Sequence, residues 1–268
     1  MNLSIYMDEL RLALRLGDNF ASKLAIFRDF LGYHFANRIG KSYSGDAAPI
    51  KSYSVNLAGR SIKLRLRPRG GDFYVLHEIF GRGLFAVEKE ISKHFDLSTV
   101  RNFVDLGANV GLVSLYYATI LPNAKFVCLE PDHGNFQLMS ENLSWLKDRG
   151  IFIEGAAADT SGYHSFDNSG QSYRKRLSGD GNIKVRAYTI PELMSAAQIQ
   201  EIDIIKIDIE GGEKQILEGN LDWLAGTRAI LIELHDGFSE EDLVGILTPL
   251  GFKLKRLDVG ENFLAIRA

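Results

Sequence analysis

The segment from Val104 to Gly111 constrains the fold of this chain more than any other. It reads Val-Asp-Leu-Gly-Ala-Asn-Val-Gly, so an apolar strand ends in an acid and turns through two glycines into an apolar helix. Glycines let the backbone turn tightly and approach a ligand, and the N-terminus of the next helix offers unpaired N–H groups. The segment predicts a small-molecule cofactor pocket, although some turns of this kind only reverse the chain.

A second apolar run, 126–129, ends in Glu130-Pro131-Asp132. In doubly wound sheets, an acid about 20 residues beyond the glycine-rich turn accepts hydrogen bonds from a ribose diol. Here 130 − 111 gives 19. We therefore predict that Glu130 binds a ribose. The alternative is that it only precedes a solvated turn at the end of a strand.

The loop after Asp105 lacks the middle glycine of the dinucleotide pattern G-x-G-x-x-G. A pyrophosphate is best bound by backbone N–H groups with no adjacent anion. By contrast, an ionised Asp105 could bind the α-ammonium group of S-adenosylmethionine, directly or through water. The sequence thus favours S-adenosylmethionine over a nicotinamide cofactor.

Five ordered motifs resemble the FkbM family of S-adenosylmethionine-dependent methyltransferases. They are VDLGANVG at 104–111, CLEPD at 128–132, GAAADTSG at 155–162, IIKIDIEGGE at 204–213 and LIELHD at 231–236. The resemblance covers roughly residues 70–268. It implies a class I methyltransferase fold and O-methylation of hydroxyls on sugars, polyketides and related products. The cofactor-binding residues expected from the motifs are Asp105, Gly107, Ala108, Asn109, Gly111, Glu130, Pro131, Asp132, Ala157 and Asp159.

Strands and helices alternate from residue 99 onward, which predicts an α/β fold with a doubly wound, mostly parallel sheet. The strands are expected near 101–106, 125–130, 151–155, 202–208 and 228–234. Two further strands, 252–257 and 262–267, have a short connection and should form an antiparallel hairpin. The hairpin brings the sheet to the seven strands of the class I methyltransferase type. We expect a methyltransferase domain at 99–268, preceded by a helical extension at 1–48 and an accessory β/α segment at 49–98.

The N-terminal appendage combines helical and strand patterns. Residues 3–16 and 20–36 have helical spacing, with Leu10, Leu14, Leu24, Phe27, Leu31 and Phe35 on repeating faces. We expect these faces to pack on the main domain or on a second subunit, which would make the protein a homo-oligomer; binding to a membrane surface is the weaker alternative. In and just after the strand 61–67, Lys63, Arg65, Arg67 and Arg69 should project together. Such a row is usually the solvated face of an edge strand and less often an anion site.

Composition excludes several classes of protein. The formal net charge of −3 argues against general nucleic-acid binding, and the single cysteine allows no internal disulfide. No apolar run is long enough to span a membrane, and Asp8 and Glu9 lie where a signal peptide would be apolar. We therefore expect a cytoplasmic enzyme.

A polar, glycine-containing segment at 168–182 separates two short predicted strands at 163–167 and 183–187. Long irregular loops at the carboxyl edge of a parallel sheet often act as lids. We predict a flap over 163–187 whose Tyr173, Arg174, Lys175 and Arg176 contact the acceptor. The alternative is a surface loop without a role.

The fourth and fifth parallel strands carry the catalytic candidates. Alternation along 204–210 brings Lys206, Asp208 and Glu210 to one side, and His235 follows the next strand. Lys206 could neutralise a carboxylate or bind the acceptor, while Asp208 and Glu210 should face cofactor and acceptor. We predict His235 as the base that removes the hydroxyl proton, oriented by Glu233 or Asp236, with Glu233 also near the substrate. A structural histidine is the alternative.

Three other interpretations remain open. Asp208, Glu210, Glu233 and His235 could hold magnesium, as in metal-dependent catechol methyltransferases, but no compact ligand motif fixes that geometry, so metal-free base catalysis ranks first. A non-catalytic nucleotide-binding or scaffold module of the same fold is a second. A nicotinamide-dependent oxidoreductase is a third, opposed by the loop and by the terminal hairpin. The acceptor itself, a small molecule or glycan with a free hydroxyl, is not specified by the chain.

Overall fold

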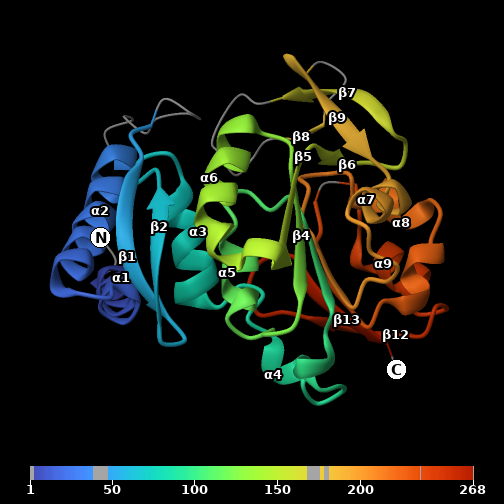
Figure 1. Ribbon diagram of the computed structural model, residues 1–268, viewed down its shortest axis with the longest axis horizontal. Helices are drawn as coiled ribbons and strands as arrows, with labels where there is room; N and C mark the ends of the chain where they lie inside the picture. Colours follow the sequence, from blue (N-terminus) through green and yellow to red (C-terminus); the bar gives the residue numbers. More distant parts are fainter. Residues whose placement is uncertain (1–2, 39–47, 168–175, 178–180, 236, 268) are drawn as a thin grey trace.

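The computed structural model describes residues 3–38, 48–167, 176–177, 181–235 and 237–267. Its centre is a seven-stranded sheet with the strand order β12-β13-β11-β10-β3-β4-β5 (Figure 1). The parallel strands are β3 (Asn102–Leu106), β4 (Lys125–Glu130), β5 (Gly150–Glu154), β10 (Ile204–Ile207) and β11 (Ala229–Glu233). The antiparallel hairpin consists of β12 (Phe252–Arg256) and β13 (Asn262–Arg267), and β13 also pairs with β11. The predicted sheet and its C-terminal hairpin are therefore confirmed.

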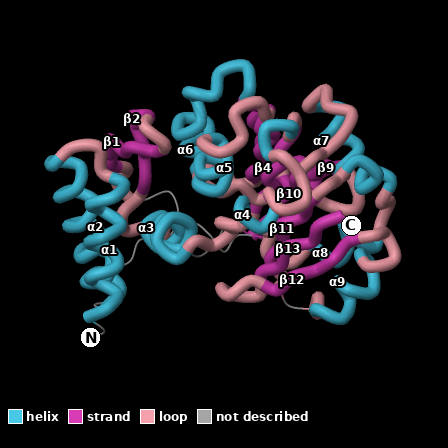
Figure 2. Tube along the Cα trace, turned by 90° about the horizontal axis from the view of Figure 1, so that it is seen from below, coloured by secondary structure: helices cyan, strands magenta, loops and turns pink. Residues whose placement is uncertain are grey.

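Helices cover both faces of this sheet (Figures 1 and 2). They are α5 (Leu112–Ala118), α6 (His133–Leu143), α7 (Ile190–Ala196), α8 (Glu213–Glu218) and α9 (Glu240–Leu247), with 3₁₀ turns at Leu97–Thr99, Ser144–Arg149 and Asp222–Gly226. Because successive residues of a strand point to opposite faces, Phe103 packs with the α5–α6 side and Val104 with the α7–α9 side. The strands are buried on both faces, which explains their nearly continuous apolar sequences.

The N-terminal part adds two helices, a hairpin and short helical turns to one side of the molecule. Its elements are α1 (Leu3–Leu16), α2 (Phe20–Arg38), β1 (Lys51–Leu57), β2 (Arg60–Leu66), α3 (Asp72–Leu76), the π-helix His77–Arg82 and α4 (Glu88–Ile91). The inward faces of α1 and α2 carry Leu12, Leu16, Ile26 and Phe30, which join the same hydrophobic core as the α5–α6 side of the sheet.

One of the two alternatives for the helical faces is wrong. Leu10, Leu14, Leu24, Leu31 and Phe35 do not pack on the main domain; their side chains are exposed, and among the predicted residues only Phe27 packs against the core. The helices bury their other faces instead. Packing of the exposed faces on a second subunit stays a prediction.

No described helix is both long and apolar enough to cross a membrane.

Arg67 does not lie with Lys63 on the solvated face of the hairpin. Its guanidinium is buried and pairs with Asp72, with Nη2 3.0 Å from Oδ1. Arg65 pairs with Glu141 of α6. The basic row is therefore divided between a buried ion pair and the surface.

The crossover between β5 and β10 forms a small separate sheet of four strands, in the order β6-β9-β7-β8. Its strands are β6 (Ala156–Ala157), β7 (Gly162–Asp167), β8 (Arg176–Leu177) and β9 (Ile183–Tyr188), so the two predicted short strands are confirmed. The predicted acceptor contacts Tyr173, Arg174 and Lys175 lie outside the described residues. Arg176 begins β8, and the neighbouring Leu177 lines the central cavity.

Candidate functional site

The glycine-rich turn after β3 brings two strand ends together. Gly107 has φ +71°, and a Cβ atom built on it would lie 1.9 Å from the carbonyl oxygen of Asp208. No side chain fits there, so only glycine allows the exits of β3 and β10 to approach so closely. Gly111, with φ +84°, directly precedes α5. The turn therefore has the tight geometry that its sequence predicts.

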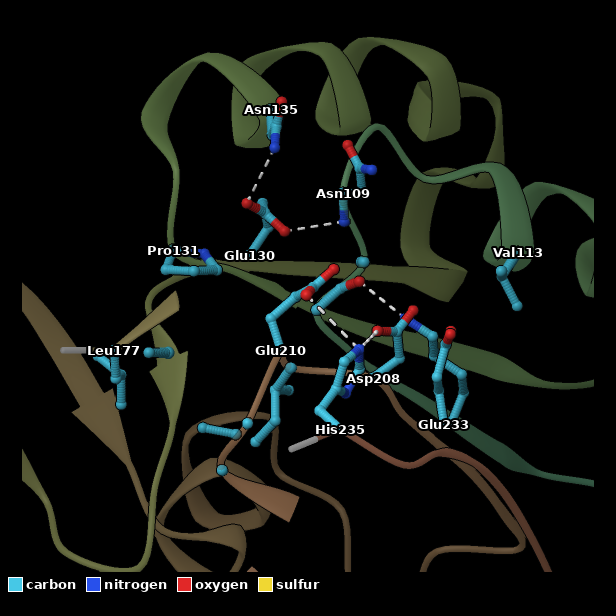
Figure 3. Close-up of a pocket in the computed structure, with 18 of the residues that line it drawn as sticks. Asn109, Val113, Glu130, Pro131, Asn135, Leu177, Asp208, Glu210, Glu233 and His235 are labelled. Atoms are coloured by element: carbon cyan, nitrogen blue, oxygen red, sulfur yellow. Dashed lines mark hydrogen bonds and ion pairs between the residues drawn. The ribbon is translucent and has the colours of Figure 1, made fainter. Parts of the chain in front are cut away.

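A cavity of about 770 Å³ opens at the carboxyl ends of the parallel strands (Figure 3). One end is lined by Gly107, Ala108, Asn109, Glu130, Pro131, Ala157 and Asp159. The other is lined by Lys206, Asp208, Glu210, Glu233 and His235. Most predicted site residues are thus brought into one cavity. Its third wall was not predicted: Tyr74 and Val75 of α3 and Glu78 and Ile79 of the π-helix.

Glu130 lies at the first end and is almost completely buried. Its Oε2 accepts a hydrogen bond from the backbone N–H of Asn109 at 2.8 Å, and its Oε1 accepts one from Asp132 N at 3.0 Å. Asn135 Nδ2 donates a further hydrogen bond to Oε1 at 3.3 Å (Figure 3). Burial raises the pKa of Glu130 to about 7, against the lowering effect of these donors. The side chain is therefore fixed in place, and its carboxyl group changes protonation state near neutral pH.

Asp105 and Asp132 do not line the cavity. The carboxylate of Asp105 is fully buried: Ser114 Oγ donates to its Oδ2 at 2.6 Å, and Lys206 Nζ lies 3.4 Å from its Oδ1. The expected direct contact between Asp105 and a cofactor ammonium is not supported, because the strand turns this side chain toward α5. Asp132 instead caps α6, where it accepts a hydrogen bond from Asn135 N at 3.0 Å.

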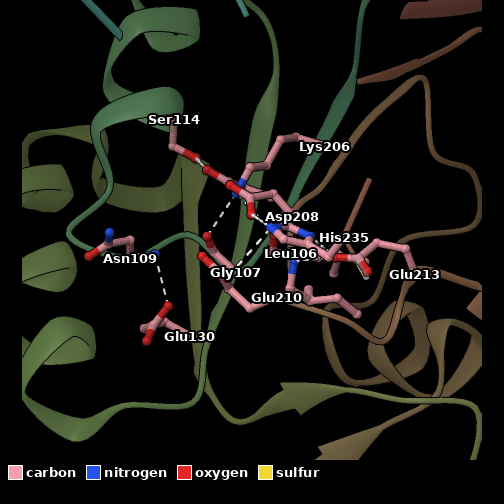
Figure 4. A network of polar contacts seen from close by, with 12 residues as sticks. Leu106, Gly107, Asn109, Ser114, Glu130, Lys206, Asp208, Glu210, Glu213 and His235 are labelled. Carbon is pink, nitrogen blue, oxygen red and sulfur yellow. Dashed lines mark hydrogen bonds and ion pairs between the residues drawn. The ribbon is translucent and has the colours of Figure 1, made fainter. Parts of the chain in front are cut away.

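Lys206 lies between the buried carboxylate of Asp105 and the carboxylate of Asp208, which lines the cavity (Figure 4). Its ammonium lies 3.4 Å from Asp105 Oδ1 and 3.2 Å from Asp208 Oδ2, and it donates to the carbonyl oxygen of Gly107 at 2.8 Å. Burial alone would lower the pKa of Lys206, but the charges of Asp208 and Asp105 outweigh it and raise this pKa. Of its two predicted roles, the structure shows the neutralisation of carboxylates.

His235 lies at the second end with its two ring nitrogens in different surroundings (Figure 4). Its Nδ1 is 2.9 Å from Oε1 of Glu213, whereas its Nε2 lies 3.5 Å from Glu210 Oε2 and 3.9 Å from Asp208 Oδ1. Burial favours the neutral ring, but Glu213, Asp208 and Glu210 outweigh it and raise the pKa of His235 to about 9. The base role expected for His235 requires the neutral imidazole, whereas these neighbours favour the imidazolium at neutral pH.

Glu233 also lies at this end and is half-buried. Burial, followed by the nearby charge of Asp208, raises its pKa to about 8. Single ligand atoms of Asp208, Glu233 and His235 lie within 4.8 Å of one another. Among the residues that the structure describes, this is the group whose spacing suits a metal ion. Asp236, the other predicted partner of His235, lies outside them.

Glu213 is a functional candidate that sequence reasoning missed. It is buried, and its Oε1 accepts hydrogen bonds from Ile209 N at 3.0 Å and Gly211 N at 3.3 Å, besides contacting His235. In the sequence, an acid at this position is explained simply by the positive end of the helix dipole in the first turn of α8. The signal that could have revealed it is the pattern Glu210-Gly-Gly-Glu213, in which two glycines shortly after a strand let the chain turn back around a carboxylate.

Comparison with known proteins gives consistent results. A family model described as the methyltransferase FkbM domain matches residues 105–263. Hexuronic acid methyltransferase AglP of Haloferax volcanii is 23% identical over 164 residues, which cover 60% of this chain and 67% of AglP. The 2-O-methyltransferase NoeI of Sinorhizobium fredii is 28% identical over 153 residues, which cover 50% of this chain and 63% of NoeI. The matches thus span about two thirds of each relative.

Solved structures of low sequence identity also align with the chain. The methyltransferase domain of METTL16 aligns with a TM-score of 0.46 at 15% identity, over 72% of this chain and 68% of that domain. A precorrin-6y C5,15-methyltransferase from Geobacter metallireducens aligns with a TM-score of 0.42 at 13% identity, over 70% of this chain and 89% of that protein.

Proposed function

Because the chain belongs to the FkbM methyltransferase family, we propose that it transfers the methyl group of S-adenosylmethionine to a hydroxyl oxygen of a sugar or natural-product acceptor. The observation that carries the proposal is the single cavity that joins the glycine-rich turn and Glu130 to the polar group around His235. One end suits a nucleoside, and the other suits an acceptor with hydroxyl groups. A methyl transfer needs both to be bound next to each other.

The first end of the cavity fits the cofactor. Asn109 lines it with a side-chain oxygen that has no hydrogen-bond partner among the described residues, and the carboxylate of Glu130 accepts three hydrogen bonds. Glu130 would accept hydrogen bonds from the ribose diol, the turn from Gly107 to Gly111 would lie against the cofactor, and Ala157 and Asp159 would border it. When bound, S-adenosylmethionine supplies a methyl group activated by its sulfonium.

The second end would hold the acceptor hydroxyl. Three carboxylates line it: Asp208, which is paired with Lys206, Glu233, whose protonated form is favoured by burial, and Glu210. Our candidate for accepting the hydroxyl proton is Glu210, which lines the cavity and whose Oε2 lies 3.5 Å from Nε2 of His235. Its backbone has φ +60°, an uncommon conformation for a residue other than glycine, and this places its side chain in the cavity.

The acceptor class is inferred from the relatives. AglP is named for hexuronic acid and NoeI for 2-O-methylation, so hydroxyls of sugars are the natural first class to test. A cavity that combines the apolar side chains of Val75 and Ile79 with a polar end is suited to a sugar ring, which has both apolar and hydroxyl-bearing surfaces.

The test is transfer of label from S-adenosylmethionine to a panel of neutral sugars, uronic acids and hydroxylated natural products. We expect a labelled methyl ether with one acceptor class, and we expect Glu210→Gln to abolish this product while keeping its affinity for S-adenosylhomocysteine. Saturable binding of a nicotinamide dinucleotide, with none of either adenosyl compound, would overturn the proposal. Cofactor binding without transfer to any member of a broad panel would favour the scaffold alternative.

A further inference from the structure

We propose that Asp208, Glu233 and His235 form a binding site for a divalent cation, and that this cation holds the acceptor by two neighbouring hydroxyl groups. We infer the cation site from the arrangement of these three side chains in the cavity. Its role in the reaction rests on the proposed function. This assignment reverses the preference for metal-free catalysis that the sequence suggests.

The three residues have the spacing of a mononuclear site. Asp208 follows β10, and Glu233 and His235 lie at the end of the adjacent strand β11, so neighbouring parallel strands bring them together. Their ligand atoms lie within 4.8 Å of one another. A magnesium ion with oxygen ligands at about 2.1 Å needs neighbouring ligands roughly 3 Å apart and opposite ones roughly 4 Å apart. Side-chain rotations that bring these atoms closer together would close the site.

The ring of His235 is oriented as that of a metal ligand. Glu213, which lies outside the cavity wall, holds Nδ1 at 2.9 Å and leaves Nε2 directed toward the cavity. A carboxylate on one ring nitrogen with the metal on the other is the usual arrangement at metal-binding histidines. The distances from Nε2 to Glu210 and Asp208 are 3.5 Å and 3.9 Å, longer than the 2.7–2.9 Å typical of charge-assisted hydrogen bonds. Neither carboxylate is therefore in close hydrogen-bond contact with this nitrogen.

The charges at this end of the cavity call for a cation. Asp208, Glu210 and Glu233 all line it, and Glu213 lies directly behind His235. A bound cation would displace the protons that Glu233 and His235 hold in its absence. Lys206 is the nearest lysine, but its ammonium is shared between Asp208 and the buried Asp105. Carboxylates that are partly removed from water are unfavourable unless they are paired or bind a metal. A divalent ion would compensate them and still leave positions for the acceptor.

The cation would activate the acceptor and select its class. An oxygen bound to a divalent ion loses its proton more readily, and two adjacent sugar hydroxyls can both reach one ion. The acceptor would therefore be a vicinal diol. The hydroxyl proton passes to Glu210, the oxygen forms a bond to the methyl carbon, and the carbon–sulfur bond breaks, so that the sulfonium becomes the neutral thioether of S-adenosylhomocysteine.

Manganese binding tests the site without requiring turnover. We would titrate the protein with Mn²⁺, follow the electron paramagnetic resonance signal of the free ion, and measure the affinity for S-adenosylhomocysteine by calorimetry in EDTA. We expect saturable Mn²⁺ binding that Asp208→Asn and Glu233→Gln each weaken at least about tenfold, with the nucleoside affinity retained as evidence of folding. Glu154→Gln is the matched control, because Glu154 pairs with His133 at 2.9 Å on the surface.

Three outcomes would overturn the inference. They are a free-ion signal unaffected by the protein, equal binding by wild type and both site variants, and equal weakening by Glu154→Gln, each of which indicates no site or an adventitious ion only. Full methyl transfer to the true acceptor in EDTA would remove the cation from the reaction while leaving the proposed function intact. Failure to bind S-adenosylhomocysteine in EDTA would instead count against the proposed function.

Discussion

Nδ1 of His235 lies 2.9 Å from Oε1 of Glu213, and this carboxylate is itself buried outside the cavity. The same oxygen accepts hydrogen bonds from the backbone N–H groups of Ile209 and Gly211, so it acts as an acceptor toward Nδ1, which carries a proton, while Nε2 faces the acceptor end. Glu213 also holds the backbone of Ile209 and Gly211, and thereby positions the loop that carries Glu210. It acts through other residues and is a positioning residue.

We predict that Glu213→Gln lowers kcat by about 10–100-fold, the range seen when a residue that orients an active group is lost. The affinity for S-adenosylhomocysteine should not change, because Glu213 is remote from Glu130. Steady-state kinetics and calorimetry would measure both. Glu218→Gln, on the exposed side of the same helix, is the matched control. A parallel loss of nucleoside affinity and of unfolding free energy in Glu213→Gln would mean that its role is only structural.

Glu130→Ala should weaken cofactor binding by roughly 1.5–3 kcal/mol, because the ribose diol loses a charged hydrogen-bond acceptor. Calorimetry with S-adenosylhomocysteine gives this value directly. Glu154→Ala is a close control, since Glu154 is the residue paired with Glu130 on the neighbouring strand β5. An unchanged dissociation constant in a folded Glu130→Ala protein would show that Glu130 is only a strand-end residue.

Cofactor affinity should depend on pH through Glu130. Its pKa in the unbound protein is raised to about 7 by burial, and the ionised carboxylate binds ribose hydroxyls better than the protonated acid. Binding therefore lowers this pKa, and affinity should increase as the pH rises toward about 7 and then level off, with proton release on binding below that value. Calorimetry in buffers of different ionisation enthalpy detects the released protons. Glu130→Gln should abolish the dependence; its persistence would assign it to another group.

Lys206→Met should destabilise the fold by about 3–5 kcal/mol, because it leaves Asp105 with Asp208 as uncompensated charges, one of them fully buried. Urea unfolding measures the loss. Adding Asp105→Asn to Lys206→Met should recover part of it, since one buried charge is then removed. Lys125→Met, at the exposed start of β4, should change stability little. Equal stability of the Lys206 and Lys125 variants would rule out the role of Lys206 as a buried counter-charge.

Local sequence patterns predicted most of the architecture. Apolar runs bounded by glycine or by an acid identified the parallel strands, and the short connection after β12 identified the hairpin. The cavity was predictable for the same reason: the carboxyl ends of parallel strands meet at one edge of a sheet, so Glu130 and His235 had to lie along one edge. The glycine at 107 was predictable as a tight turn, but its contact with Asp208 was not.

The tertiary structure decided how individual side chains are used. Asp105 was expected to bind the cofactor directly or through water, but Ser114 and Lys206 hold its buried carboxylate, so a direct contact is not supported. Arg67 was expected on the surface, but it is buried and forms an ion pair with Asp72. The apolar stripe of α2 that includes Leu24 is exposed, because the helix buries its opposite face. A sequence pattern specifies which element forms and which faces it has. Which face is covered, and which charge meets which partner, depends on the folded packing, whether the partner is near in the sequence, as Asp72 is to Arg67, or distant, as Lys206 is from Asp105.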